Sequence, residues 1–203
     1  MEPITILMNE HRVIEQVLGC LDKMTAQAAA TRTLDTAAAH KAIVFFRSFA
    51  DKCHHGKEEA KLFPFVESLG FPRDGGPTGV MMTEHEEGRS CVRRMAEAVK
   101  AVEEGRQSGV SIFVEAARAY IALLTTHIRK EDSCLFPMAE QNMTSDDEQA
   151  LLAEFERAET EEMNVGDHEQ LLSLADALAE QFGVAKAETC GRGAHVAACG
   201  HRA

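Results

Sequence analysis

A repeated segment in the two halves of the chain constrains its fold more than any other sequence feature. Residues 54–64 read His-His-Gly-Lys-Glu-Glu-Ala-Lys-Leu-Phe-Pro, and residues 127–137 read His-Ile-Arg-Lys-Glu-Asp-Ser-Cys-Leu-Phe-Pro. A Glu-His pair precedes each copy, at 10–11 and 84–85, and the histidine of the pair lies 43 residues before the first copy and 42 before the second. The repeat predicts two hairpin units of one design that meet around an approximate twofold axis.

Apolar residues recur three or four positions apart along most of the chain, which is the spacing of one face of an α-helix. His11, for example, lies on the same face as Leu7, Ile14 and Leu18. Breaks rich in Gly and Pro, clearest at 73–77, divide the pattern. The expected helices are residues 4–30, 36–69, 78–104, 110–141 and 145–182. No strand-like alternation persists, so we expect an all-α protein.

The lengths and short connections of the first four helices favour an up-down-up-down antiparallel four-helix bundle. We assign this bundle to residues 1–141, an additional C-terminal helical extension to residues 142–182, and a flexible tail containing Cys and His to residues 183–203. The tail is rich in Gly and Ala, and we expect it to be largely disordered. The role of the extension stays open between covering the bundle, contacting a partner and supporting a homodimer.

The overall charge of the chain is strongly acidic. Its 203 residues carry a formal net charge of −12, which argues against binding to nucleic acid or to an anionic membrane surface. We find no secretory leader, and no apolar run approaches the roughly 18–20 residues of a membrane span. We therefore expect a cytoplasmic protein whose cysteines Cys20, Cys53, Cys91 and Cys134 are free thiols.

The spacing inside the repeat indicates a metal site. Residues four apart lie on one face of a helix, so His54 and Glu58 can reach one ion, as can His127 and Glu131. These helix faces are otherwise apolar, and a glutamate buried there without a partner costs several kcal/mol or a large shift of its pKa. Cations held between the helices remove that cost.

The candidate ligand set combines the repeat with the Glu-His pairs. It comprises His11, His54, Glu58, His85, His127 and Glu131. Four imidazoles and two carboxylates suit iron, manganese or zinc, and carboxylates that bridge serve two ions in the dimetal sites of helical bundles. This set leaves coordination positions open for oxygen, peroxide or another small ligand.

Two neighbouring residues are weaker candidates for ligands. His55 follows His54 in the chain but lies about 100° around an α-helix from it. Glu15 stands four residues after His11, yet the matching place in the second half is occupied by Arg89.

Other residues that could react or bind metal, and the repeated tripeptides, have simpler interpretations. Tyr120, the only tyrosine, lies two turns before His127, and it either serves a bound ligand or electron transfer or packs in the core. We expect the Leu-Phe-Pro tripeptides and Cys53 and Cys134 to contribute packing, and His40 and His168 to lie at the surface. The tail residues that could bind a soft metal are Cys190, His195, Cys199 and His201, although their spacing fits no compact zinc pattern.

The order His, His-x-x-x-Glu, His, His-x-x-x-Glu resembles that of the hemerythrin-like family, also called HHE cation-binding domains. The resemblance covers residues 1–141 and implies a four-helix bundle with two non-haem iron ions (Fe) joined by an oxo or hydroxo bridge. It implies terminal ligands at His11, His54, His85 and His127 and bridging carboxylates at Glu58 and Glu131.

Arg89 is a departure from the family pattern. Hemerythrins that carry oxygen have a further histidine at this place, so one iron needs His55, Glu15 or water instead. The departure favours a more reactive centre or a sensor over stable oxygen carriage. Arg89 itself is a candidate for offsetting carboxylate charge or attracting an anion such as peroxide.

Three functions follow from this reading. The leading one is a diiron protein that binds a small diatomic or peroxide ligand (dioxygen, peroxide or nitric oxide) for sensing, delivery or stress protection. The alternatives are a diiron enzyme that consumes hydrogen peroxide or reduces oxygen or nitric oxide, and an iron- or zinc-binding module without redox chemistry. The sequence leaves enzymatic activity and any redox partner open.

Overall fold

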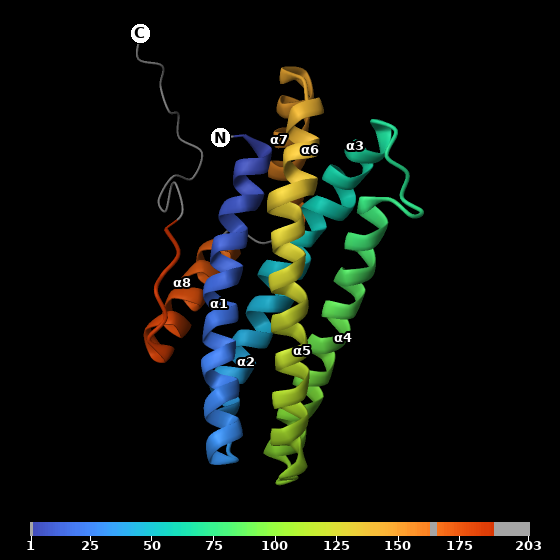
Figure 1. Cartoon of the computed structure of the whole chain (residues 1–203). Coiled ribbons are helices and arrows are strands. Elements are labelled where there is room, and N and C mark those ends of the chain that lie inside the picture. The colour runs from blue at the N-terminus through green and yellow to red at the C-terminus, as the bar shows by residue number, and fades with distance from the viewer. Residues whose placement is uncertain (1, 163–165, 189–203) are drawn as a thin grey trace.

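A computed structural model describes residues 2–162 and 166–188, and these residues form a bundle of helices without any strand (Figure 1). The all-helical class predicted from the sequence is confirmed. The elements are α1 (Pro3–Thr31), α2 (Thr36–Phe45), η1 (Phe46–His55), η2 (Glu58–Leu62), α3 (Phe63–Ser68), α4 (Pro77–Glu103), α5 (Ser108–Lys130), η3 (Glu131–Leu135), α6 (Phe136–Asn142), α7 (Ser145–Glu162) and α8 (Asp167–Phe182), where η marks a π-helix.

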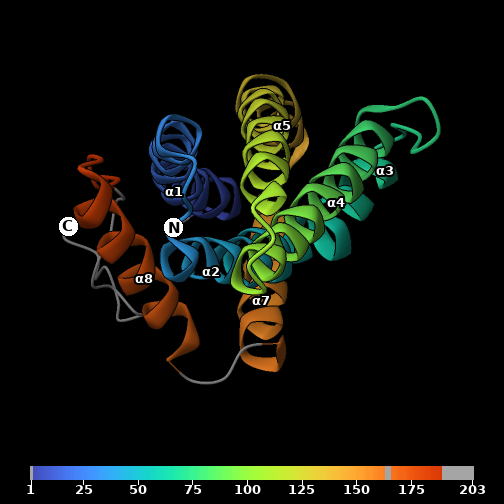
Figure 2. The same cartoon turned by 90° about the horizontal axis from the view of Figure 1, so that it is seen from below.

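Two of the long helical rods are composite. One runs from α2 through η1 and η2 to α3, and the other runs from α5 through η3 to α6. These rods, α1 and α4 lie side by side along the molecule (Figures 1 and 2), with α5 packed against α1 and α4, and α2 and η1 packed against α4. Each composite rod carries one copy of the repeated segment.

Local chemistry sets the helix boundaries. The carboxylate of Asp35 accepts a hydrogen bond of 2.9 Å from the backbone N–H of Ala38 and caps α2. Pro77 opens α4, at a position where no backbone donor is needed. Gly105, with a φ of 80°, follows the end of α4 in the left-handed conformation that glycine adopts without strain. Both the cap and the glycine stop lie where the sequence places breaks.

The hydrophobic core consists of two clusters separated along the bundle axis. The larger contains Ile14, Ala50 and Leu124, and the smaller contains Leu7 and Leu62 among others. His11 lies between Leu7 and Ile14 in the sequence of α1, and corresponding gaps occur in the other rods. The polar residues of the repeat therefore form a layer between two apolar clusters.

Two of the π-helices have a cause in the sequence, the prolines of the Leu-Phe-Pro tripeptides. A proline inside a helix lacks the N–H donor, and its ring collides with the carbonyl four residues earlier. In both rods the backbone N–H before the proline, that of Phe63 or Phe136, donates instead to the carbonyl of Glu58 or Glu131, five residues back. The wider turns accommodate Pro64 and Pro137 without ending the rods, so the tripeptides lie inside the helices.

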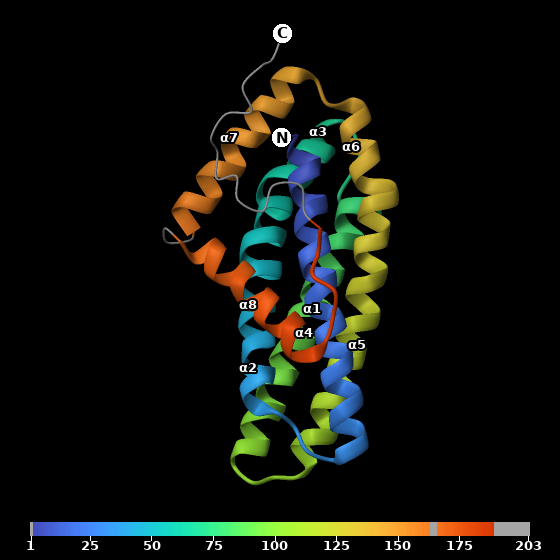
Figure 3. The ribbon, with the colours of Figure 1, turned by 90° about the vertical axis from the view of Figure 1, so that its left-hand side faces the viewer.

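The C-terminal extension lies along one side of the bundle (Figure 3). The sequence predicted one helix over residues 145–182, whereas the structure has two, α7 and α8, and Gly166 directly before α8 has a φ of 92°. Helix α7 contacts α1, η1 and η2, whereas α8 contacts α1, α2 and η1. Among the three roles left open by the sequence, the contacts match a cover for the bundle.

The rod Ser108–Asn142 is long and apolar enough to cross a membrane by length and composition alone. No such segment was predicted from the sequence, because the chain contains no unbroken apolar run of roughly 18–20 residues. Within the bundle this rod packs against α1 and α4 and buries His127 and Glu131. These are properties of a core helix.

Candidate metal centre

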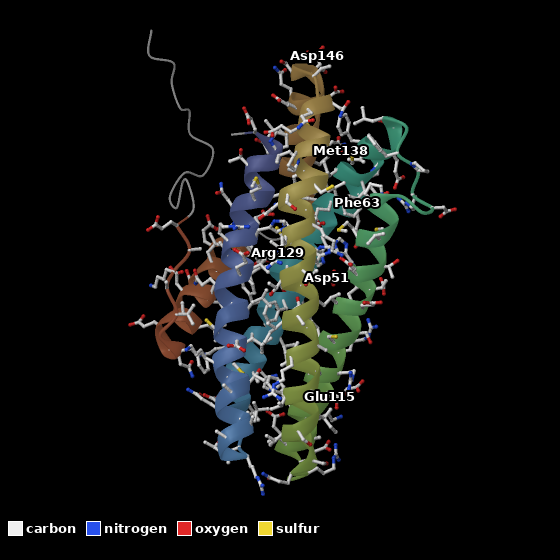
Figure 4. All side chains as sticks on the ribbon, in the orientation of Figure 1. Asp51, Phe63, Glu115, Arg129, Met138 and Asp146 are labelled. Atoms are coloured by element: carbon white, nitrogen blue, oxygen red, sulfur yellow. The ribbon has the colours of Figure 1, made fainter. Side chains whose placement is uncertain are left out.

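Two groups of buried histidine and glutamate side chains meet in the layer between the apolar clusters. The first group is His11, His54, Glu58 and Glu131, and the second is His55, Glu58, His85 and His127. Within each group, one nitrogen or oxygen from every residue lies within 4.8 Å of the others. The structure thus brings together all six predicted side chains and adds His55. Figure 4 labels Asp51 and Phe63, and the residues that η1 and η2 contribute lie between these two in the chain.

The Nε2 atoms of the histidines face the two carboxylates. Glu131 Oε2 lies 3.1 Å from His127 Nε2 and 3.3 Å from His11 Nε2. The oxygens of Glu58 lie 3.5 Å from His54 Nε2 and 3.4 Å from His85 Nε2. Each glutamate therefore faces histidines from two different helices.

The inward atoms lack hydrogen-bond partners within the described residues. They are both carboxylate oxygens of Glu58 and of Glu131 and the Nε2 atoms of His11 and His54. Leaving a buried polar group unpaired costs about 1–3 kcal/mol, and more when it is charged. Imidazole nitrogens and carboxylate oxygens are ligands of transition metals, so the unpaired donor set fits metal ions.

The pKa values of the two glutamates are shifted in opposite directions. Burial, followed by the proximity of Glu131, raises the pKa of Glu58 well above its ordinary value. Burial also acts to raise the pKa of Glu131, but His127 and His11 outweigh it and lower that pKa. Without a cation, the two carboxylates cannot both be ionised at low cost, and bound cations would allow it.

A second carboxylate holds the other ring nitrogen of each predicted histidine. The Nδ1 contacts are His11 with Asp132 (2.7 Å), His54 with Glu10 (2.9 Å), His85 with Glu59 (2.7 Å) and His127 with Glu84 (3.0 Å). When Nδ1–H donates to a carboxylate, Nε2 keeps the free lone pair that a metal needs. The outer carboxylates therefore favour the tautomer that binds metal at Nε2.

Each outer carboxylate also contacts a cationic side chain. The cations are Arg12 at Asp132, Lys57 at Glu10, Arg89 at Glu59 and Lys130 at Glu84. The motifs contained this pattern, because the glutamate of each Glu-His pair and the second acid of each repeat are its members. The recurrence of these acids is visible in the sequence, but the histidine that each one contacts lies on another helix and is not.

The phenylalanines of the Leu-Phe-Pro tripeptides pack on histidine rings. Phe63 stacks on His85 with ring centroids 5.7 Å apart, and Phe136 stacks on His11 at 5.2 Å. The two contacts are related by the repeat. The expected packing role of the tripeptides thus extends to the walls of the candidate metal centre.

His55 enters the centre from the π-helix η1, in which the backbone N–H of Gly56 donates to the carbonyl of Asp51, five residues back. His55 points to a different side of this helix from His54, and it therefore joins the second group while His54 joins the first. His55 is buried and stacks on His85 at a centroid distance of 3.8 Å. His55 therefore supplies a histidine to the second group, although this chain has Arg89 where hemerythrins that carry oxygen have their further histidine.

Arg89 does not present free donors to the centre. Its guanidinium lies 2.8 Å from Asp51, 2.7 Å from Glu59 and 2.7 Å from Glu86. Of the two roles considered from the sequence, offsetting carboxylate charge agrees with these contacts. Attraction of an anion such as peroxide does not, because the contacts to carboxylates occupy the guanidinium.

The remaining candidates lie outside both groups. Glu15 is an exposed partner of Arg12 at 3.2 Å, and Tyr120 is buried against Phe46 in the larger core cluster. His40 lies at the surface beside Glu103, as expected. His168 is half-buried against Phe49, which corrects the expectation of a surface position.

Four of the six cysteines lie within the described residues, whereas the candidate ligands of the tail do not. Cys20, Cys53, Cys91 and Cys134 are free thiols, as predicted. The tail residues Cys190, His195, Cys199 and His201 lie outside the residues that the structure describes.

Comparison with known families agrees with the motifs. A profile of the hemerythrin HHE cation-binding domain matches residues 2–139. The chain belongs to the hemerythrin HHE cation-binding family. The resemblance seen in the motifs is confirmed, and helices α7 and α8 of this hemerythrin-like protein follow the matched region.

Three curated relatives of this hemerythrin-like protein are described as uncharacterized proteins, two from strains of Mycobacterium tuberculosis and one from Mycobacterium bovis. Each is 26% identical over 153 residues, covering 75% of this chain and 59% of the relative. The chain therefore spans about three fifths of the length of the curated relatives it matches. No solved structure matches the chain.

Proposed function

We propose that this protein holds two non-haem iron ions and binds a small ligand, namely dioxygen, peroxide or nitric oxide, for sensing, delivery or stress protection. His11 and His54 would bind one ion, and His55, His85 and His127 the other. Glu58 and Glu131 would bridge the two. When bound, a pair of iron ions supplies redox chemistry toward oxygen and its reduced forms.

The observation that carries this proposal is the position of Glu58 in both groups. Its two oxygens face histidines of different groups, at 3.5 Å from His54 and 3.4 Å from His85. A single-ion site needs no shared carboxylate, whereas a dinuclear site uses one. Two carboxylates also offset part of the charge of two cations in a layer where water is excluded.

The donor sets of the two groups favour a ligand site at one ion. The first group has two histidines and the second has three. An ion in the first group therefore has fewer imidazole ligands and more room for an external ligand. The walls near it include Phe136, which stacks on His11 and keeps the surroundings apolar.

The rest of the assignment rests on the fold. We infer that α1, the two composite rods and α4 follow an up-down-up-down order in a four-helix bundle spanning residues 1–141. Residues 142–182 would form a covering extension, and we propose a cytoplasmic location. The short connections between antiparallel neighbours support the topology.

Metal analysis of protein purified without oxygen tests the proposal. We expect two iron ions per chain and, on admission of air, a ligand-to-iron charge-transfer band that is absent from the reduced protein. Loss of hydrogen peroxide far in excess of the protein would assign the enzymatic alternative. A colourless protein that holds zinc and gives no band would overturn the proposal in favour of a module without redox chemistry.

A further inference from the structure

Each half of the centre contains a lysine that contacts a glutamate, which in turn contacts a histidine, and the two sets of contacts differ in their burial. In the first half, Lys57 contacts Glu10, which contacts His54 Nδ1 at 2.9 Å. In the second half, Lys130 contacts Glu84, which contacts His127 Nδ1 at 3.0 Å. The repeat relates the two chains of contacts residue by residue.

The two sets of contacts differ in exposure to water. The side chain of Lys57 is 1% exposed and that of Glu10 is 6% exposed, whereas those of Lys130 and Glu84 are 39% and 16% exposed. A lysine is almost never fully buried unless it is paired. The first half therefore retains, inside the protein, an ion pair that the second half keeps near the surface.

The C-terminal extension accounts for this difference. The ring centroid of Phe155 in α7 lies 5.9 Å from Lys57 Nζ, within the range of a cation–π contact. Phe155 is itself buried, and nearby Lys61 and Glu154 join η2 to α7 at 2.5 Å. The extension follows the second half of the chain but covers the ion pair of the first.

We propose that Lys57 is a positioning residue that acts through Glu10 to fix His54 for metal binding, and that α7 makes this half of the centre the more rigidly prepared of the two. This inference rests on the proposed function, since it concerns the same centre. Enclosed side chains have few alternative rotamers, so Glu10 stays on His54 Nδ1. At the exposed counterpart, water competes for Glu84 and Lys130.

Titration of the metal-free full chain with Co²⁺ tests the proposal, because this ion reports each binding step by its visible absorption. For Lys57→Met we expect the affinity for one of two ions to fall about 10–100-fold, the usual effect of losing a residue that orients a ligand, while the other changes less than about threefold. The matched control Lys130→Met should weaken its own step by less than about tenfold. Nitrogen-15 spectra of the metal-free chain should show His54 protonated at Nδ1, and a mixture of tautomers in Lys57→Met.

A second variant covers the case in which Lys57→Met does not fold. Phe155→Ala keeps the ion pair but exposes it, and it should weaken the same step by an intermediate factor. Equal weakening of both steps, or unchanged affinities and an unchanged His54 tautomer, would overturn the inference. If the unaltered protein bound no Co²⁺, the proposed function would fail instead, so the two failures are distinguishable.

Discussion

The four predicted histidines of the centre are each held by a carboxylate at Nδ1. Nε2 faces Glu58 or Glu131, as His127 shows with contacts of 3.0 Å from Nδ1 to Glu84 and 3.1 Å from Nε2 to Glu131. A hydrogen bond at Nδ1 orients the ring and favours one tautomer before a metal arrives. Prior organisation of this kind raises affinity because less freedom is lost on binding.

His55 gives the sharpest prediction at this scale. We expect His55→Asn to reduce bound metal from two ions toward one per chain, since the group of His85 and His127 loses one of its four members. Elemental analysis measures the change. The control is His40→Asn, which alters an exposed histidine and should leave two ions. Retention of both ions in His55→Asn would contradict the ligand assignment.

Glu58 should destabilise the protein when no metal is bound, because burial and the proximity of Glu131 raise its pKa. The change Glu58→Gln removes this ionisable group, and the new amide can donate to a histidine Nε2 atom. We expect the metal-free variant to be about 1–2 kcal/mol more stable than the metal-free parent and to lose affinity for metal. Urea unfolding in the presence of a chelator measures this.

A matched change at the surface controls for the effect of charge alone. Glu15→Gln alters an exposed carboxylate and should change the free energy of unfolding by less than about 0.5 kcal/mol. A Glu58→Gln variant that is less stable than the parent without metal would show that the Glu58 carboxyl group is satisfied in some other way.

Sequence reasoning was most successful for residues related by the repeat. Spacing of four residues and an apolar face placed His54, Glu58, His127 and Glu131 together, and the structure agrees. It did not place His55, because the angle between His54 and His55 indicates only that they face different directions, and the second group lies on the side that His55 faces. Partners such as Glu10 and His54 come from different helices, and spacing along one helix cannot reveal such pairs.

At the scale of elements, the π-helical turns position the two glutamates and the phenylalanines of the candidate metal centre. The turns η2 and η3 begin at Glu58 and Glu131 and end just before the phenylalanines that stack on His85 and His11. Helix boundaries were predicted closely, because caps, glycines and loop prolines signal them. The π turns were not predicted, because only a packing role was assigned to the tripeptides that contain Pro64 and Pro137.

Removing one proline tests the role of its turn. In Pro137→Ala the new backbone N–H can bond four residues back, to the carbonyl of Ser133, so the rod should relax toward an α-helix. We expect thermal stability to stay equal or rise, whereas metal affinity falls about tenfold or more because Glu131 is rotated.

Circular dichroism melts and Co²⁺ titration measure the two effects separately. Pro72→Ala, in the exposed loop before α4, is the control and should change neither. Unchanged metal affinity in Pro137→Ala would show that the proline does not control the position of Glu131.

At the scale of the whole molecule, we expect the metal-free protein to lose stability in acid. Burial, followed by His11, lowers the pKa of His54 from 6.5 to about 4. Between these values the unfolded chain binds the proton at His54 and the folded chain does not, so this group lowers the free energy of unfolding as the pH drops from 6.5 to 4. His55 acts in the same direction, because burial and His85 lower its pKa as well, and together the two histidines outweigh Glu58, whose raised pKa has the opposite effect. Burial opposes a second shift, but Lys57 and His54 lower the pKa of Glu10 to about 2, which extends the loss below pH 4.5.

Urea unfolding of the metal-free chain across this pH range measures the slope. The metal-loaded chain should be more stable near pH 6.5 and lose its ions on acidification, because protons compete for the same ligands. A metal-free chain whose stability is flat from pH 6.5 to 4 would contradict the enclosed, uncharged state of His54.

Neither half of the chain contains all the residues of either candidate ligand group. The first group takes Glu131 from beyond the exposed loop at 71–76, and the second takes His55 and Glu58 from before it. A cut in that loop would leave two fragments, each with part of the ligands for both ions. Such a nicked protein should hold together more tightly while loaded than after a chelator strips it, because the ions add ligand bonds to the apolar clusters that join the two fragments.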